Sequence, residues 1–304
     1  MRSRAQIVVV GGGPGGLCAA LSAAQNGAEV TLLDAYPEPG GQFYHQPPRW
    51  RLANATRRQT QGRALWQRAQ AAGVKIRSEV LVWNTSSERI LSLNGPEGVE
   101  EIQADALILA TGAYERPAAF PGWTLPGVIT SGAAQILLYH KVRPGKRLLV
   151  AGAGPLQLVT AAHLVQAGVK VAAVLEGGRL VSKGLRQPWA LWGQWERARE
   201  GLESLLTLAS RKVPFLSGWG ILAAHGDEQV EGATIARLDE KWRPIPGTER
   251  EVACDTICTG YGLVPFNALS RLCGAEQEWR PGQGGEVPRR DAWMQTSVPG
   301  IYAV

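Results

Sequence analysis

The sequence QIVVVGGGPGGL, residues 6–17, sets the architecture of the chain. Residues 7–10 are an unbroken run of β-branched side chains, which predicts a strand buried on both faces of a parallel sheet. Gly11, Gly13 and Gly16 then fall in GxGxxG register, and small residues continue as a helix. In such a unit the first glycine makes the turn, the second lets the backbone approach a diphosphate, and the third lets the helix pack close to the strand.

The next segment, AEVTLLDAYPEPGG, strengthens this weak motif because it predicts a second strand ending in Asp34. That position is about 20 residues on, where an acid accepts hydrogen bonds from an adenosine ribose. Pro14 and Gly15, which lie between the second and third glycines of the motif, are further candidate cofactor contacts. The positive dipole end of the helix favours an anion without a lysine. A glycine turn followed by a strand-end Asp, with no ligand, remains the alternative.

Composition narrows the class of protein. A length of 304 residues predicts about two domains. The net charge of +6 comes without a dense Lys/Arg block, so no nucleic-acid binding is predicted. No secretory signal precedes the first strand and no apolar run approaches the roughly 20 residues that span a bilayer. We therefore expect a cytoplasmic protein with no integral membrane segment.

Cysteine and histidine residues indicate neither a redox dithiol nor a metal site. The four cysteines form no CxxC, and the four histidines show no metal-binding spacing. The sequence predicts no metal, and we name no catalytic residue from it.

Two stretches predict further cofactor contacts at the same sheet edge. Gly41 permits close backbone approach, and Gln42 offers a donor and an acceptor beside it. A strand at 106–109 is followed by the small residues Ala110, Thr111 and Gly112. This ATG, roughly 100 residues after a GxGxxG strand, favours a flavin domain over a simple dehydrogenase.

Residues 144–178 repeat the order of strand, glycine turn, helix, strand and acidic residue, and they predict a second nucleotide site. Gln157 stands where the third glycine would be, which crowds the helix against the strand. Glu176 favours a free 2′-hydroxyl, so NAD, ADP or ATP is expected over NADP. The candidate contacts of this second site are Gly152, Gly154, Pro155, Leu156, Glu176 and Gly260.

The remaining segments are less specific. Trp189, Trp192 and Trp195 recur every three residues in a predicted helix, which indicates either core packing or burial between subunits. Residues 213–251 predict an antiparallel sheet. Arginines at 49, 51, 57, 58, 63 and 68 predict a solvated helix face, with an acidic partner as the alternative.

The run ATGAYERPAAFPGWTLPGVITSGAAQILL, residues 110–138, together with GGQFYHQP at 40–47, resembles the flavoproteins with two dinucleotide domains. It is most similar to the alpha subunits of heteromeric opine, octopine, nopaline and hydroxyproline or proline dehydrogenases. The resemblance implies an α/β fold of two Rossmann-like domains, like those of glutathione and thioredoxin reductases. It also implies that the second domain, 122–262, is inserted into an FAD domain formed by 1–121 and 263–304.

In that family the first domain holds FAD, so the resemblance carries the contacts Gly11, Gly13, Gly16, Asp34, Gln42, Thr111 and Gly112, with Val82 near the adenine. It implies an FAD-dependent oxidoreductase that transfers electrons with two partners, a flavin-containing beta subunit together with an iron–sulfur subunit. Two alternatives remain open: a stand-alone NADH-dependent flavoprotein reductase, and a non-catalytic nucleotide-binding scaffold.

The flavoproteins that this chain resembles continue from the last strand into a Gly-Asp turn, whereas this chain stops at Val304. We expect either a fragment or weakened flavin binding.

Overall fold

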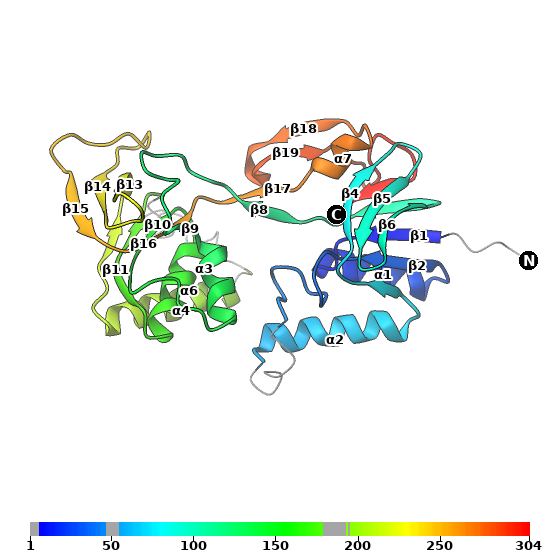
Figure 1. Ribbon diagram of the computed structural model, residues 1–304, viewed down its shortest axis with the longest axis horizontal. Helices are drawn as coiled ribbons and strands as arrows, with labels where there is room; N and C mark the ends of the chain where they lie inside the picture. Colours follow the sequence, from blue (N-terminus) through cyan, green and yellow to red (C-terminus); the bar gives the residue numbers. More distant parts are fainter. Residues whose placement is uncertain (1–5, 47–54, 179–192, 194) are drawn as a thin grey trace, which may run out of the picture. The chain divides into compact units, whose positions relative to one another are not determined.

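The computed structural model describes residues 6–46, 55–178, 193 and 195–304. The chain divides into two compact units, which are described separately (Figure 1). Unit 1 comprises residues 1–114 and 264–304, and unit 2 comprises residues 115–263. Within the described residues, no helix combines the length and apolar content needed to cross a bilayer.

Unit 1 is built on a parallel five-stranded sheet in the order β20-β7-β1-β2-β3. Its strands are β1 (Gln6–Val10), β2 (Glu29–Leu33), β3 (Lys75–Arg77), β7 (Ala106–Leu109) and β20 (Ile301–Ala303). The central strand β1 pairs with β2 and β7 in register, so all carboxyl ends meet at one edge. Because the strand order reverses direction beside β1, that edge is where α/β proteins of this type bind ligands.

The two faces of this sheet are covered differently, which explains the apolar run of β1. Val9 packs with α1 (Pro14–Gln25) and α2 (Arg57–Ala71). Val8 and Val10 pack toward the antiparallel strands β4 (Leu81–Thr85), β5 (Ile90–Gly95) and β6 (Gly98–Gln103). Burial on both faces therefore requires β-branched residues without alternation, as predicted.

The second stretch of unit 1 supplies a small layer beside the sheet edge. It contains α7 (Ala268–Leu272), β18 (Gln277–Arg280), the 3₁₀ turn η3 (Pro281–Gln283) and β19 (Gly285–Pro288). Strands β18 and β19 form an antiparallel ribbon. Two short strands that pair, β8 (Ala113–Glu115) and β17 (Leu263–Pro265), carry the chain out of this unit and back.

Unit 2 repeats the architecture with a parallel sheet in the order β12-β11-β10-β16-β9. The strands are β9 (Val128–Thr130), β10 (Arg147–Gly152), β11 (Lys170–Glu176), β12 (Phe215–Ser217) and β16 (Thr256–Gly260). One face packs against α3 (Ser131–Tyr139), α4 (Leu156–Gln166) and α6 (Trp195–Ser210). The other face packs against antiparallel strands β13 (Trp219–His225), β14 (Gly232–Arg237) and β15 (Arg250–Ala253).

The structure corrects three details. Strand β12 pairs parallel with β11, so the antiparallel sheet begins at Trp219 and not at residue 213. Residues 115–121, expected in the first domain, belong with unit 2, because Phe120 packs in its core and Pro121 accepts a hydrogen bond from the Ala224 amide. Trp195 is 67% exposed and is therefore no core residue, while Trp189 and Trp192 lie outside the described residues.

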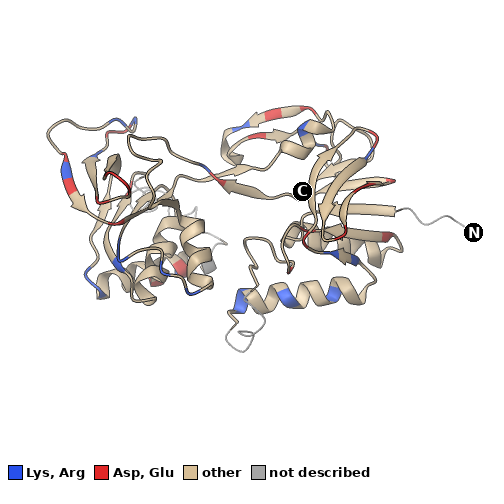
Figure 2. Ribbon diagram, in the orientation of Figure 1, with Lys and Arg blue, Asp and Glu red and all other residues tan. Residues whose placement is uncertain are grey.

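Arginines recur along the length of α2 (Figure 2). Arg57, Arg58 and Arg68 are exposed, and Arg63 forms an ion pair with Glu38 at 3.3 Å. This placement agrees with the predicted solvated face. Arg49 and Arg51 fall outside the described residues.

Candidate functional site

Two glycines of the first motif are required by close backbone packing. A Cβ added at Gly11, which has a φ of +104°, would lie 2.3 Å from the Ala110 carbonyl oxygen. A Cβ added at Gly16 would lie 1.8 Å from the Gly11 carbonyl oxygen. The turn therefore rests directly on β7, and α1 rests on the turn, so any side chain at either position would separate these elements.

Gly13 and Gly15 differ, because a Cβ there would meet no close protein atom. The nearest atoms would be the Gly41 Cα at 4.0 Å and the Val304 Cγ2 at 3.6 Å, respectively. Helix α1 begins with Pro14 at its first position, with no side-chain cap and no acidic residue in its first turn. Its first amide groups and its positive dipole end are therefore available to an anion outside the chain.

The Asp34 carboxylate stabilises the glycine turn through hydrogen bonds to backbone amides. Its side chain is 5% exposed; Oδ2 accepts a hydrogen bond from the Gly12 amide at 2.6 Å, and Oδ1 accepts one from the Tyr36 amide at 2.8 Å. Burial raises the pKa of this carboxyl, and the two amide bonds partly offset that effect. Each oxygen keeps a second lone pair, so the predicted ribose contact stays a prediction.

Gly41 and Gln42 lie beside the same turn. A Cβ at Gly41 would lie 2.9 Å from the Gly13 Cα, so this loop passes directly against the motif. The Gln42 amide donates to the Tyr36 hydroxyl at 3.0 Å. The Val82 side chain is in the core, packed with Leu33 and Leu93, so only its backbone can face a ligand.

Residues 110–112 are held by a segment that sequence reasoning missed. The Thr111 hydroxyl donates to the Phe266 carbonyl at 2.6 Å, and the Phe266 amide donates to the Gly112 carbonyl at 2.9 Å. Gly112 has a φ of +71°, and a Cβ there would meet nothing within 4 Å. The ATG turn is therefore fixed in place while its outer side stays open.

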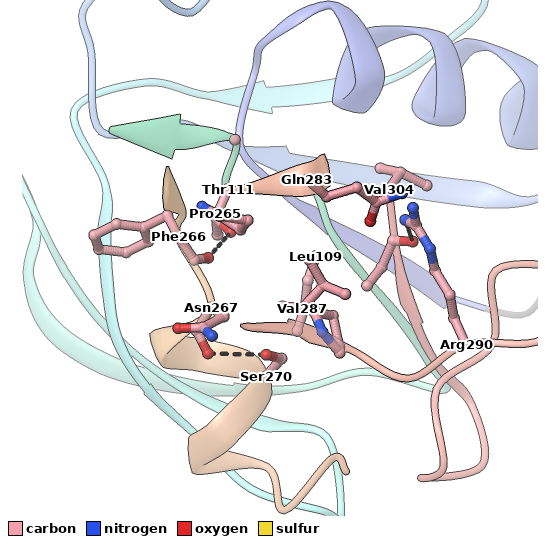
Figure 3. Close-up of a pocket in the computed structure, with 13 residues that line it drawn as sticks. Leu109, Thr111, Pro265, Phe266, Asn267, Ser270, Gln283, Val287, Arg290 and Val304 are labelled. Carbon is pink, nitrogen blue, oxygen red and sulfur yellow. Dashed lines mark hydrogen bonds between the residues drawn. The ribbon is translucent and has the colours of Figure 1, made fainter. Parts of the chain in front are cut away.

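A cavity of about 180 Å³ opens at the carboxyl ends of β7 and β20 (Figure 3). Its wall mixes apolar side chains with the polar side chains of Thr111, Asn267, Ser270 and Gln283, and Arg290 is its one charged lining residue. The lining residues are Leu109, Thr111, Gly112, Pro265, Phe266, Asn267, Ser270, Gln283, Val287, Pro288, Arg290, Ala303 and Val304.

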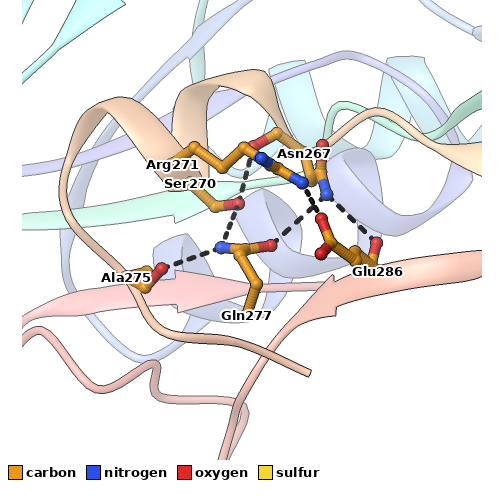
Figure 4. Close-up of polar contacts among 6 residues, drawn as sticks. All are labelled: Asn267, Ser270, Arg271, Ala275, Gln277 and Glu286. Atoms are coloured by element: carbon orange, nitrogen blue, oxygen red, sulfur yellow. Dashed lines mark hydrogen bonds and ion pairs between the residues drawn. The ribbon is translucent and has the colours of Figure 1, made fainter. Parts of the chain in front are cut away.

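A hydrogen-bond network supports one wall of this cavity (Figure 4). The Asn267 amide donates to the Glu286 carbonyl at 3.1 Å and to Gln277 Oε1 at 3.4 Å. The Gln277 amide in turn donates to the Ser270 hydroxyl at 3.2 Å and to the Ala275 carbonyl at 2.8 Å. Because α7 is thereby tied to the β18–β19 ribbon, the wall is held in one arrangement. No sequence motif marks these residues.

The carboxyl edge of unit 2 has comparable geometry. A Cβ at Gly152 would lie 2.1 Å from the Gly260 carbonyl oxygen, so β10 and β16 touch there. Gly154 has a φ of +101° and open space at its Cβ position, and α4 starts after Pro155, at Leu156, without a side-chain cap. Glu176 is 1% exposed at the end of β11, and the Ser217 hydroxyl donates to its Oε2 at 3.4 Å.

Gln157 stands where the motif has its third glycine, and its buried polar surroundings do not satisfy its hydrogen-bonding groups. The side chains of Gln157 and Ser131 are fully buried, and a Cβ at Gly260 would lie 3.7 Å from the Gln157 Cβ and 2.9 Å from the Ser131 Oγ. Among the described residues, neither the Gln157 amide atoms nor the Ser131 hydroxyl has a hydrogen-bond partner. Glu115 accepts from the Gly132 amide at 2.7 Å and so occupies the N-terminus of α3. Of these two helices, α4 is therefore the one whose first turn carries no carboxylate.

The cysteines provide no redox pair, and we predict that only one is reactive. All four are free thiols; Cys18 is exposed, whereas Cys254, Cys258 and Cys273 are buried. Burial raises the pKa of all three buried thiols, and that of Cys254 rises to about 11. At pH 8 the Cys254 thiolate fraction is then only about one in a thousand.

Iodoacetamide at pH 8 should therefore add one label to the native chain and four to the denatured chain, as counted by mass spectrometry. Rapid labelling of two or more sites under native conditions would contradict this burial. Groups of acidic, histidine or cysteine residues able to hold a metal are absent from the described part of the chain.

The comparison with protein families confirms the predicted resemblance. A family model for pyridine nucleotide-disulphide oxidoreductases matches residues 5–304. The chain is 34% identical over 305 residues to hydrogen cyanide synthase subunit HcnB of Pseudomonas aeruginosa, and 31% identical over 305 residues to an opine oxidase subunit of Rhizobium meliloti. Each alignment covers 97% of this chain but 64% of the relative, so the chain spans under two thirds of those proteins.

Solved structures support the fold. L-proline dehydrogenase from P. horikoshii superposes with a TM-score of 0.65 at 19% identity, covering 99% of this chain and 50% of that one. Thioredoxin reductase from T. acidophilum superposes with a TM-score of 0.67 at 19% identity, covering 98% of this chain and 88% of that one. The predicted fold with two dinucleotide-binding domains is thereby confirmed.

Proposed function

This chain belongs to the pyridine nucleotide-disulphide oxidoreductase family, and from that premise we propose that it is the nucleotide-binding, electron-transferring subunit of a heteromeric amino-acid or opine dehydrogenase. Family membership indicates FAD and a pyridine nucleotide as cofactors. We assign FAD to unit 1 and NAD, ADP or ATP to unit 2.

One observation carries the proposal. In each unit, a glycine with free space at its Cβ position precedes a helix whose first turn has no side-chain cap. In unit 1, Gly13 has no atom closer than 4.0 Å to its Cβ position and precedes α1. In unit 2, Gly154 has none within 4 Å and precedes α4. A diphosphate binds to bare backbone and to unpaired amides, so the residues present fit such a ligand at both edges.

The residues of unit 1 bind and orient a flavin nucleotide in this proposal. Asp34 holds the glycine turn and faces the ribose, α1 receives the diphosphate, and Thr111 and Phe266 fix the turn that borders the cavity. FAD, when bound, accepts a hydride equivalent and passes electrons onward. No side chain of unit 1 is assigned as a catalytic base.

The free cysteines argue against a disulphide reductase. A reductase of the dithiol type needs two accessible thiols that can form a disulphide, whereas this chain has no CxxC and three of its four thiols are buried. The relatives support a heteromer, because they are named as subunits of hydrogen cyanide synthase and of opine oxidase. We therefore propose two partners: an iron–sulfur subunit, together with a beta subunit that contains a flavin.

A stand-alone NADH-dependent flavoprotein reductase is the second candidate, favoured by the buried acid Glu176 at the edge of unit 2. The test begins by denaturing the purified chain and identifying the released nucleotides by mass; an FAD titration of the chain follows. Loss of the flavin absorbance near about 450 nm with NADH alone, under anaerobic conditions, would establish this second candidate.

Reduction by proline or an opine only when the beta subunit is present would support the heteromer. If the chain neither releases FAD nor binds it, the oxidoreductase proposal fails, and a non-catalytic nucleotide-binding scaffold becomes the better description.

A further inference from the structure

Arg290 differs from the other charged side chains in the second stretch of unit 1. Residues 264–304 contain four arginines and four acidic residues. Three arginines are matched by acids: Arg271 pairs with Glu286, Arg280 with Glu278, and Arg289 with Glu276. The fourth acid, Asp291, accepts hydrogen bonds from the Trp293 and Gln295 amides at 2.8 and 2.9 Å.

Arg290 therefore carries a positive charge without a carboxylate within 4 Å among the described residues. Its side chain lines the cavity of unit 1 and is partly buried (Figure 3). One guanidinium nitrogen donates to the Ala303 carbonyl at 2.8 Å, which holds the head group at the carboxyl end of β20. A guanidinium has five N–H donors, so several remain for a ligand.

The position of this charge relates it to α1. Arg290 is bonded to Ala303, and the next residue, Val304, packs 3.6 Å from the Cβ position of Gly15 in the first turn of α1. The Val304 amide also donates to the Leu109 carbonyl at 3.0 Å. The Arg290 guanidinium and the start of α1 therefore lie at the same sheet edge. Arg290 contacts Ala303, and the helix contacts the adjacent residue, Val304.

From these contacts we infer that Arg290 binds a phosphate of the flavin nucleotide held by unit 1. This inference rests on the proposed function. The first turn of α1 supplies amide donors but no cation, and Arg290 supplies the cation. Guanidinium binds phosphate through two parallel hydrogen bonds. The rest of the cavity wall carries no charge, so it suits the uncharged part of the ligand.

The test compares Arg290→Gln with Arg289→Gln, two neighbouring residues given the same change. Arg289 is exposed and paired with Glu276, so it serves as the matched control. Binding of FAD and of riboflavin, which has no phosphate, is measured by flavin fluorescence. We expect Arg290→Gln to weaken FAD binding about 10- to 100-fold and to change riboflavin binding less than about twofold.

Arg289→Gln should leave both affinities within about twofold of the unmodified chain. Arg290→Lys, which keeps the charge and a donor to the Ala303 carbonyl, should recover part of the FAD affinity and covers the case in which Arg290→Gln does not fold. An unchanged FAD affinity in Arg290→Gln, or an equal loss of riboflavin affinity, would overturn the role of Arg290 and leave the proposed function standing. An unmodified chain that binds no flavin would overturn the proposed function together with it.

Discussion

Replacing Gly16 by alanine is expected to lower the free energy of unfolding by about 3 kcal/mol or more. The added Cβ would lie 1.8 Å from the Gly11 carbonyl oxygen and 3.2 Å from the Ala110 Cβ. Backbone cannot yield as a flexible side chain can, so α1 must move away from β1 and β7. Because α1 packs on Val9 through Leu17, that movement also opens the core.

The matched control is Gly201→Ala, which makes the same change inside α6. A Cβ at Gly201 would meet nothing within 4 Å, and alanine is the better helix former by about 1 kcal/mol. Urea unfolding followed by circular dichroism should therefore show opposite shifts for the two variants. A stability of Gly16→Ala equal to that of the unmodified chain would mean that the helix does not sit on the turn as described.

Replacing Gly13 by alanine is expected to separate ligand binding from folding. The position has a φ of −71°, which alanine adopts readily, and its added Cβ would meet no protein atom closer than 4.0 Å. Stability should therefore change by less than about 0.5 kcal/mol. The same methyl group would stand where the proposed diphosphate approaches the backbone, so FAD affinity should fall about 10- to 100-fold.

Gly282→Ala is the control in the same unit, since a Cβ there also meets nothing within 4 Å and the residue does not line the cavity. Fluorescence titration with FAD should show normal affinity for Gly282→Ala and reduced affinity for Gly13→Ala, with similar unfolding curves for both. Normal FAD affinity in Gly13→Ala would place the diphosphate elsewhere, even if FAD itself binds.

Much of the fold was predictable, because its signals are local in the sequence. The run from Ile7 to Val10 is apolar on every residue, which only a strand buried on both faces requires, and the observed layers on either side meet that requirement. Gly11 and Gly16 were assigned to a tight turn and to close helix packing, and the short distances from their Cβ positions to neighbouring backbone atoms agree with both roles. A second such unit at 148–176 predicted the repeat.

Other features depend on residues that are distant in the sequence. Thr111 bonds to Phe266, and Arg290 bonds to Ala303. Three other arginines form ion pairs with acidic residues only when β18, β19 and α7 are packed together, and Arg290 is then the one without an acidic partner. The predicted role of Asp34 was incomplete for the same reason, because its bonds to the Gly12 and Tyr36 amides follow from how two loops fold together.

Local patterns of residues were enough to predict the two sheets, the glycine turns and the acids at the ends of the second strands, because spacing and side-chain size are properties of neighbouring residues. The packing of the elements against one another sets which glycines are open to a ligand and which are closed by backbone, where the cavity lies and which charged side chain lines it. Those properties depend on distances between elements, and no local pattern encodes them.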